Sequence, residues 1–394
     1  MRKRKLNVKR LISVLTGLSI IILLVVIIAL KGNKPDIAEG SQTPTVSATP
    51  TNTTTPAPVE STSPVASPSA SPQETEEPDN NLIIRTDYDN FLPNESGEIP
   101  IIMFHRFIEA YEENTDNEYT TTFAEFEALL QTLYDSGYRL ISMADFIECN
   151  ISVPAGTMPM VFTFDDGTPG QFNLIEEDGI LKVNPKSAVG IMAAFNEKHP
   201  DFGLKGIFYV NMDIGDNTFK GEGTLKERFE ILQGLGLELG THTWGHVNFS
   251  KPENFSKIKE AIGKNQQKAD EILPGLRFYS LALPHGGRPS DKSLWPLLQS
   301  GTYNNTDYYN ETIMAVGANP SVPVISNKYN SLYVARIRAQ GRVAVNADLT
   351  WWLPRMTSTR MFISDGDPTT IVVPEEKSGT INTEKLNNKV LITY

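Results

Sequence analysis

The sequence predicts an α/β domain, and three observations lead to that prediction. Short apolar runs rich in β-favouring residues alternate with stretches of helical periodicity. About 300 residues follow the N-terminal segments, which is enough for one large domain with a full hydrophobic core. Two of the runs are followed by Asp or His residues, and polar side chains at strand ends suggest one rim of a barrel. The runs lie at 99–104, 138–141, 160–164, 206–210, 237–240, 279–283 and 333–337.

The chain begins with a basic segment at 1–10 and an uncharged apolar run at 11–30. A run of about twenty apolar residues is long enough to cross a hydrocarbon core of about 30 Å. Because basic residues stay on the cytoplasmic side, we expect a single-pass protein of the cell membrane whose large domain is extracellular. An uncleaved signal anchor is favoured over a cleaved signal peptide, since the run exceeds the usual apolar region of about 7–15 residues and no clear cleavage site follows.

Residues 31–90 are predicted to form a disordered linker. Between residues 41 and 80 the chain consists of Thr, Ser, Pro and Ala with a few acidic residues and almost no large apolar ones. Such a segment cannot bury enough apolar surface to offset the entropy lost on ordering, and its prolines keep it extended. The large domain is therefore expected at 91–345, held near the membrane on a stalk that could span a cell wall.

Further features concern the helices and the tail. Thr122 and Glu125 form a capping-box signature, which predicts that a helix begins there. The tail at 346–394 contains two adjacent tryptophans and short apolar runs, so we expect it to pack on the domain as a C-terminal extension. Trp351 and Trp352 are predicted to serve packing rather than sugar binding. The chain has a single cysteine, so no disulfide can form within it.

The most informative residues are two adjacent carboxylates, Asp165 and Asp166, which follow an apolar run and precede Gly167. Side chains alternate across a strand, so the two carboxylates point in different directions. One of them can bind a metal while the other faces a substrate. The alternative is a strand-end turn in which Asp accepts hydrogen bonds from backbone N–H groups.

About eighty residues later, His242 and His246 follow another strand-like run. Two imidazoles four residues apart lie together on a helix face or in a tight loop, so both can reach one ion at about 2.0–2.1 Å. The alternative is that both are ordinary polar surface or core residues. Together with the two carboxylates, they are the parts of a mononuclear metal site with one carboxylate left over as a base.

Three motifs, in their order along the chain, resemble those of the polysaccharide deacetylases of the NodB-homology, carbohydrate esterase family 4 type. They are the segments 163–167 and 242–246 and a Pro-x-Gly segment at 281–286, and the resemblance covers roughly 99–337. It implies a distorted (β/α) barrel of about seven strands. By position, it also implies that Asp165 is the general base and that the metal ligands are Asp166, His242 and His246.

The third motif departs from the common pattern. Ala282 stands where common members have an Arg that orders the catalytic Asp, and His285 replaces the usual Tyr. The His that supplies the general acid near the end of those members is also missing, because no His follows His285. The segment 99–106, however, resembles the opening segment of circularly permuted members such as the poly-N-acetylglucosamine deacetylases. In these the acid-bearing strand stands first, which makes His105 the candidate general acid; a structural His is the alternative.

This resemblance implies the hydrolysis of an N-acetyl group. A metal lowers the pKa of water from about 15.7 towards about 7 and polarises the acetyl carbonyl. Asp165 would take the proton of the water, and His105 would give one to the departing amine. The turn formed by Pro284, His285 and Gly286 is expected to contact the substrate or stabilise the oxyanion, and His285 is the second candidate for the acid. Three ligands and an open fourth position favour one Zn²⁺, with Co²⁺ and Ni²⁺ also compatible.

Charge narrows the choice of partner. The net charge is −12, and removing the six basic residues of 1–10 leaves −18 for the rest of the chain. This argues against nucleic acid and fits a neutral N-acetylated glycan better, and no protein partner is evident. The expected function is metal-dependent N-deacetylation of a cell-surface or extracellular polysaccharide. Two alternatives stay open: an O-acetyl esterase of the same fold acting on xylan or another polymer, and a membrane-tethered glycan-binding protein without catalysis.

Overall fold

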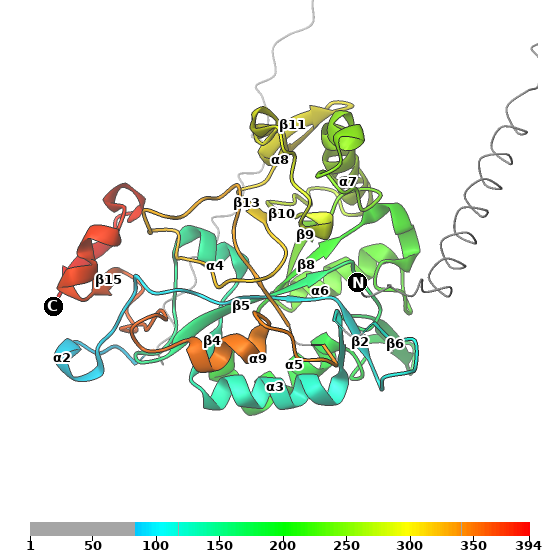
Figure 1. Cartoon of the computed structure of the whole chain (residues 1–394). Helices are drawn as coiled ribbons and strands as arrows, with labels where there is room; N and C mark the ends of the chain where they lie inside the picture. Colours follow the sequence, from blue (N-terminus) through cyan, green and yellow to red (C-terminus); the bar gives the residue numbers. More distant parts are fainter. Residues whose placement is uncertain (1–82, 117, 340) are drawn as a thin grey trace, which may run out of the picture. The chain divides into compact units, whose positions relative to one another are not determined.

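The computed structural model describes residues 83–116, 118–339 and 341–394 (Figure 1). The predicted basic segment, the anchor at 11–30 and the linker up to residue 82 lie outside these residues. Within them, no helix combines the length and the apolar character that crossing a membrane requires.

The ordered domain begins before the predicted boundary at residue 91. Helix α2 spans Tyr88–Phe91, and the amide of Arg85 donates to the carbonyl of Asp365 at 2.9 Å. The ring of Tyr88 also lies 5.8 Å from that of Tyr394. The predicted linker is therefore too long at its C-terminal end, because aromatic side chains replace the Ser, Thr and Pro residues there and pack on the domain.

The centre of the fold is an eight-stranded parallel sheet. Its strands pair in the order β13-β10-β9-β8-β5-β1-β14, and β4 pairs with the beginning of β5. Six of them coincide with predicted runs, β14 overlaps the run at 333–337 only at Ile337, and β13 lacks a predicted counterpart. The strands are β1 (Ile101–Phe104), β4 (Tyr138–Leu140), β5 (Met158–Asp165), β8 (Ile207–Val210), β9 (Glu238–Thr241), β10 (Ser280–Ala282), β13 (Thr312–Met314) and β14 (Ile337–Arg338).

The sheet curls back on itself. An isolated parallel bridge joins Met314, the last residue of β13, to Val334, which shortly precedes β14. Because β14 also pairs with β1, the pairings return to their starting point. One cluster of buried side chains accordingly receives residues from strands all along the sheet, including Ile101, Val161, Ile207, Tyr209, Ala282, Met314 and Val334. This arrangement fits the predicted distorted (β/α) barrel.

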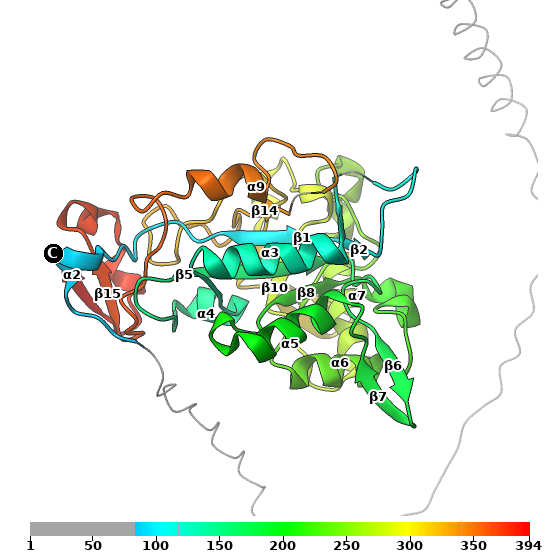
Figure 2. The ribbon, with the colours of Figure 1, turned by 90° about the horizontal axis from the view of Figure 1, so that it is seen from below.

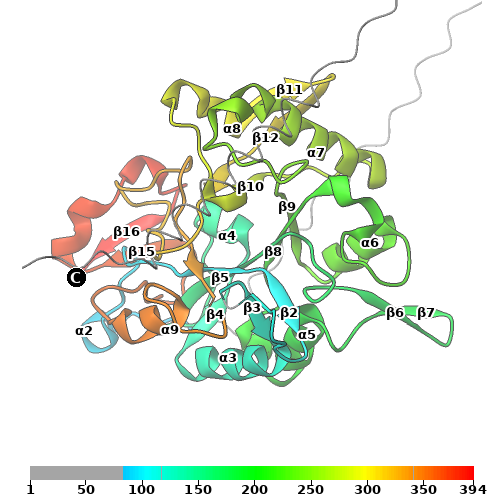
Figure 3. The ribbon, with the colours of Figure 1, turned by 45° about the vertical axis from the view of Figure 1, so that its right-hand side comes forward.

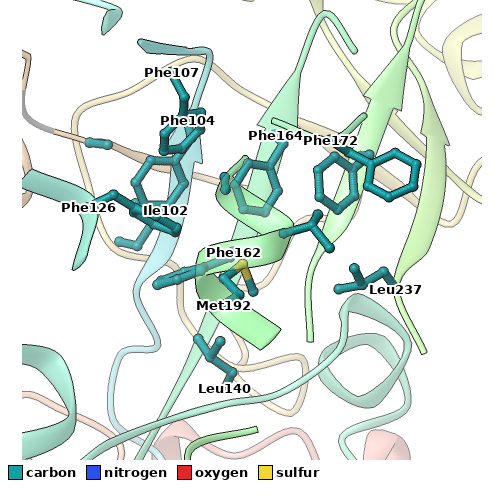
Figure 4. Close-up of a cluster of buried hydrophobic side chains, with 14 of the residues drawn as sticks. Ile102, Phe104, Phe107, Phe126, Leu140, Phe162, Phe164, Phe172, Met192 and Leu237 are labelled. Atoms are coloured by element: carbon teal, nitrogen blue, oxygen red, sulfur yellow. The ribbon is translucent and has the colours of Figure 1, made fainter. Parts of the chain in front are cut away.

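Strand β5 shows how the sequence positions the site. All eight of its residues are buried, and successive side chains face opposite sides of the sheet. Phe162 and Phe164 belong to the core beneath the helices (Figure 4). Val161 belongs to the interior cluster. By the same alternation Thr163 and Asp165 face the interior. The carboxylate of Asp165 is therefore buried within the barrel, at the end of its strand.

The outer core is rich in phenylalanine. The rings of Phe164 and Phe208 stack at 4.4 Å, and the ring of Phe104 meets that of Phe126 edge-on at 5.3 Å. Phe126 comes from α3, whose predicted capping box between Thr122 and Glu125 is present. Figure 2 shows α3 and α5 side by side over this core. The helices are α3 (Phe123–Asp135), α4 (Met143–Glu148), α5 (Ala188–Lys198), α6 (Leu225–Gly234), α7 (Ile258–Ile272), α8 (Pro296–Gln299) and α9 (Leu349–Trp352).

Residues of the C-terminal extension pack on the barrel. The ring of Trp352 is buried in the outer core, and its Nε1 donates to the carbonyl of Ala318 at 2.9 Å. Trp351 packs edge-on against it at 4.9 Å, so the pair serves packing. Figure 3 shows the final two-stranded sheet beside α2. The smaller sheets pair β2 (Arg106–Ile108) with β3 (Thr120–Thr122), β6 (Leu174–Glu177) with β7 (Ile180–Val183), β11 (Ser300–Tyr303) with β12 (Thr306–Tyr309), and β15 (Thr370–Val373) with β16 (Val390–Thr393).

Candidate metal-binding site

The predicted site residues meet at the carboxyl ends of the parallel strands. His105 directly follows β1, Asp165 ends β5, and His242 directly follows β9. The short turn η4 (Pro284–Gly286) after β10 carries His285. These residues line one cavity of about 250 Å³. Its walls are completed by Arg106, Asp116, Tyr119, Asp166, His246, Leu283 and Val316.

Asp166, His242 and His246 form a cluster that fits one metal ion, since their ligand atoms lie within 4.8 Å of one another. Oδ1 of Asp166 lies 3.4 Å from Nε2 of His242 and 3.5 Å from Nε2 of His246. The two imidazole nitrogens are 3.1 Å apart. Tetrahedral ligands at about 2.1 Å from an ion would be separated by about 3.4 Å. The donor set therefore matches a tetrahedral ion with one open position.

Local structure holds these ligands in place. Nδ1 of His242 donates to the carbonyl of Ala282 at 2.9 Å, which fixes the ring and directs Nε2 towards the cluster. Asp166 has φ 80° and His246 has φ 46°, in the left-handed region that non-glycine residues rarely adopt. His246 lies in a tight loop, one of the two arrangements that its spacing allowed. Strained backbone of this kind is common at functional sites.

The charges around the cluster favour the metal-binding protonation states of two ligands, Asp166 and His246. Burial opposes protonation of the third, His242, but the charges of Asp165 and Asp166 raise its pKa above the ordinary value. Burial opposes ionisation of Asp166, but the hydrogen bond with His242 and the charges of the neighbouring histidines hold the pKa of its carboxyl well below the ordinary value. Burial, followed by the charge of His242, lowers the pKa of His246 to about 4. An ionised carboxylate and a neutral imidazole are the forms that bind metals.

The second carboxylate, Asp165, is held apart by an arginine that sequence reasoning missed. The guanidinium of Arg336 donates to both oxygens of Asp165, at 2.7 and 2.8 Å. It also donates to Oγ1 of Thr163 and to the carbonyl of Ala315. Both charged side chains are fully buried. Burial opposes ionisation of Asp165, yet the charge of Arg336 lowers the pKa of the carboxyl below its ordinary value.

Arg336 therefore orients Asp165, whereas Ala282, at the position where the resemblance leads one to expect an arginine, cannot do so. Arg336 comes from the predicted strand run at 333–337, where it is the charged residue of an otherwise uncharged segment. A charge within a strand predicted to be buried requires a partner, and that requirement was the available signal.

His105 faces Asp165 across the cavity. Its Nε2 lies 3.8 Å from Oδ2 of Asp165, and its Nδ1 is buried without a hydrogen-bond partner among the described residues. Burial is the largest influence on this imidazole and lowers its pKa, although Asp165 and Asp166 oppose the shift. Gln171 fixes the backbone here by donating to the carbonyl of His105 at 2.5 Å. The structure thus places His105 and Asp165, the two residues predicted to be catalytic, beside the three candidate metal ligands.

The third-motif turn contributes a side chain to the cavity. The ring of His285 is exposed and lies 4.6 Å from that of His246. Pro284 is buried beneath the turn, and the amide of Gly286 donates to the carbonyl of Leu283 at 2.9 Å. A Cβ at Gly286 would approach Val316 within 2.9 Å, which explains the glycine. Because the amide of Gly286 is engaged inside the turn, His285 is the member of the turn that can reach a ligand.

Comparisons with known proteins give structural similarities. No family model matches the sequence, and no curated protein matches it. A polysaccharide deacetylase from Bacillus cereus is 17% identical over 66% of this chain and 69% of that chain, with a TM-score of 0.47. The deacetylase PplD from Streptococcus pyogenes, in complex with acetate, is 16% identical over 66% and 98% of the two chains, with a TM-score of 0.48. IcaB from Ammonifex degensii is 17% identical over 63% and 94%, with a TM-score of 0.43.

Proposed function

We propose that this chain is a metal-dependent hydrolase that removes N-acetyl groups from a polysaccharide containing N-acetylglucosamine. The observation that carries the proposal is the division between two adjacent carboxylates. Asp166 lies with His242 and His246 in a cluster of metal-ligand geometry, while Arg336 holds Asp165 outside that cluster. Both carboxylates face the same cavity.

Asp166, His242 and His246 would hold the ion, and a fourth position would face the cavity. When bound, a divalent metal would lower the pKa of water and polarise the acetyl carbonyl. The nitrogen and oxygen donors favour Zn²⁺, with Co²⁺ and Ni²⁺ as alternatives.

Two residues of the chain would then each carry out one proton transfer. Asp165 accepts a proton from the attacking water, because Arg336 keeps its carboxylate ionised and correctly oriented. His105 carries a proton to the nitrogen of the departing amine, which otherwise leaves as an unstable anion. His285, at the mouth of the cavity, is placed to contact the substrate. Its ring is also the second candidate for the acid.

The test is acetate release by the full chain from a panel of acetylated glycans, with and without a chelator. We expect release from glycans of N-acetylglucosamine, loss of release with the chelator, and recovery on addition of Zn²⁺ or Co²⁺. Release from O-acetylated xylan alone would identify an esterase. A chain that binds these glycans and releases no acetate under any condition would be a binding protein, and the proposal would be wrong.

We further propose that residues 11–30 anchor the enzyme in the cell membrane with its catalytic domain outside. The support is the uncharged apolar run and the preceding basic residues. Mass spectrometry of the membrane-extracted protein should find the N-terminal peptides attached. A mature form that begins after residue 31 would contradict the anchor.

A further inference from the structure

The loop between the candidate ligands His242 and His246 begins with a residue of unfavourable backbone conformation. Thr243 has φ 68°, in the left-handed region. A β-branched side chain is an outlier there, because the two heavy atoms on its Cβ crowd the backbone. His246, at the end of the loop, has φ 46° in the same region. A loop with two such residues keeps its shape only where surrounding groups hold it.

Asn211 is placed to hold the start of this loop. It directly follows β8, and His242 directly follows the neighbouring strand β9 (Figure 3). The amide of His242 donates to the carbonyl of Val210 at 3.0 Å, just past the paired residues of the two strands. Beyond this bond the side chain of Asn211 continues the pairing. Its Nδ2 donates to the carbonyl of His242 at 2.6 Å and to that of Thr243 at 2.7 Å.

The chemistry of these two contacts determines the orientation of the Asn211 amide. Both neighbours are carbonyl oxygens, which only accept hydrogen bonds, so the NH₂ group rather than the oxygen of the side chain faces them. Its two N–H donors then serve one carbonyl each. Asn211 is 5% exposed, and the two residues that it contacts are also buried. Removing the donors would therefore leave buried carbonyls without partners, which is unfavourable.

Other hydrogen bonds support the loop at different points. The amide of Thr243 donates to Oγ1 of Thr241 at 3.3 Å, and Oγ1 of Thr243 accepts from the amide of Val247 at 3.2 Å. The amide of Trp244 donates to the carbonyl of Ala261 on α7 at 2.7 Å. These bonds engage amides and hydroxyls of the loop and of the strand before it. Asn211 engages two carbonyls, one of which belongs to a candidate ligand.

From these contacts, we propose that Asn211 is a positioning residue that holds the loop 242–246 in its metal-binding shape before an ion arrives. In the held loop, Nε2 of His242 and Nε2 of His246 already lie 3.1 Å apart. An ion that meets such a loop binds without first ordering it, and affinity rises when this ordering cost is removed. The inference rests on the metal site of the proposed function. It goes further by assigning part of the metal affinity to a residue that is not a ligand.

The experiment measures metal affinity in the absence of substrate. The full-length wild type, Asn211→Leu and the control Asn310→Leu are freed of metal and titrated with Zn²⁺ in competition with a chromophoric chelator. Titration with Co²⁺, followed by its visible absorption, gives a second value of Kd. Leucine keeps the branching of asparagine at Cγ and lacks its donors. Asn310 is a matched control, because it is buried and donates to the carbonyl of Leu298 at 2.8 Å, outside the cavity.

Asn211→Leu should raise the Kd of both ions at least about tenfold, since loss of a group that orients metal ligands typically costs about 10–100-fold in affinity. Asn310→Leu should leave the Kd unchanged, even where it lowers the melting temperature. Thermal unfolding of the metal-free proteins shows whether each variant folds. If Asn211→Leu does not fold, the smaller substitution Asn211→Ala takes its place with Asn310→Ala as the control.

Two results would overturn the inference. The folded Asn211 variant could bind both ions as tightly as wild type does, or the Asn310 variant could lose as much affinity as the Asn211 variant. In the second case a general loss of stability would explain both changes. Either result would leave the metal site and the proposed deacetylation standing. If wild type binds neither Zn²⁺ nor Co²⁺, the metal site itself is wrong, and the proposed function falls together with this inference.

Discussion

Two regions of the domain bury acidic side chains whose pKa values shift in opposite directions. Both carboxylate oxygens of Asp165 accept hydrogen bonds from the guanidinium of Arg336, and the pKa of this carboxyl is lowered despite its complete burial. Glu95 is equally buried beside Asp365, and neither forms an ion pair with a basic residue of the described part. Burial, followed by the charge of Asp365, raises the pKa of Glu95 well above its ordinary value. Both acids are fully buried, so the opposite directions of their pKa shifts follow from their different partners.

The two regions also differ in what they do for the protein. Oε2 of Glu95 accepts from the amide of Val372 at 2.7 Å, and Oδ2 of Asp365 accepts from Thr370 at 2.8 Å. These bonds tie the start of the domain to β15, so this acid pair has a structural role. The carboxylate of Asp165, by contrast, faces a cavity and lies beside the three candidate metal ligands Asp166, His242 and His246. A shifted pKa is therefore evidence for a catalytic group only together with such surroundings.

The largest expected effect is on turnover and concerns the proposed acid. His105→Ala should reduce acetate release from a glycan by about 10²–10⁴-fold, the usual range for a general acid, with metal content largely kept. The loss should be smaller for an aryl acetate, because an aryloxide needs little protonation to depart. Steady-state kinetics with both substrates make the measurement, and His199→Ala serves as the matched control outside the cavity.

The same kinetics separate the two candidate acids. His285→Ala should weaken substrate binding or oxyanion stabilisation for both types of substrate. If His285→Ala shows the dependence on the leaving group while His105→Ala stays active, the acid is His285 and the resemblance to permuted members has misled the assignment.

A second change tests the ion pair by its effect on stability. Arg336→Met leaves Asp165 buried without its cation and should lower the free energy of unfolding by about 3–5 kcal/mol. Arg277→Met removes an exposed partner of Asp270 and should cost about 0–1 kcal/mol. Denaturant unfolding of both variants provides the comparison. Equal losses would show that Arg336 does not compensate a buried charge.

A smaller effect is expected at the other acid pair. Because the folded pKa of Glu95 is raised, its contribution to stability is complete below its ordinary value of 4.5 and is lost as the pH rises through the folded value. Glu95→Gln should remove this loss, so the variant gains stability relative to wild type as the pH rises, by no more than about 2 kcal/mol. Thermal unfolding at several pH values measures the difference. A stability difference between Glu95→Gln and wild type that does not change with pH would show that folding does not raise the pKa of Glu95.

Much of the fold was predictable because local signals agreed with it. The apolar runs became strands, and the capping box of Thr122 and Glu125 begins α3. Strand β13 had no counterpart among the predicted runs. The linker boundary was placed too late, since the contacts of Arg85 and Tyr88 are made with residues near the end of the chain.

The residues of the candidate site were likewise predictable only in part. Asp166, His242 and His246 were predictable because adjacent motif residues carry the signal. The partner of Asp165 is 171 residues away in sequence, and only the closure of the sheet brings Arg336 to it.

The central claim is that two adjacent carboxylates have separate tasks, and one measurement tests it directly. Metal content and acetate release are determined side by side for wild type, Asp165→Asn and Asp166→Asn. Asp165→Asn should retain about one divalent metal per chain but lose turnover, since it removes the base and keeps all three ligands. Asp166→Asn should lose both. Turnover close to that of wild type in Asp165→Asn, or equal loss of metal from both variants, would show that the two carboxylates do not divide these tasks.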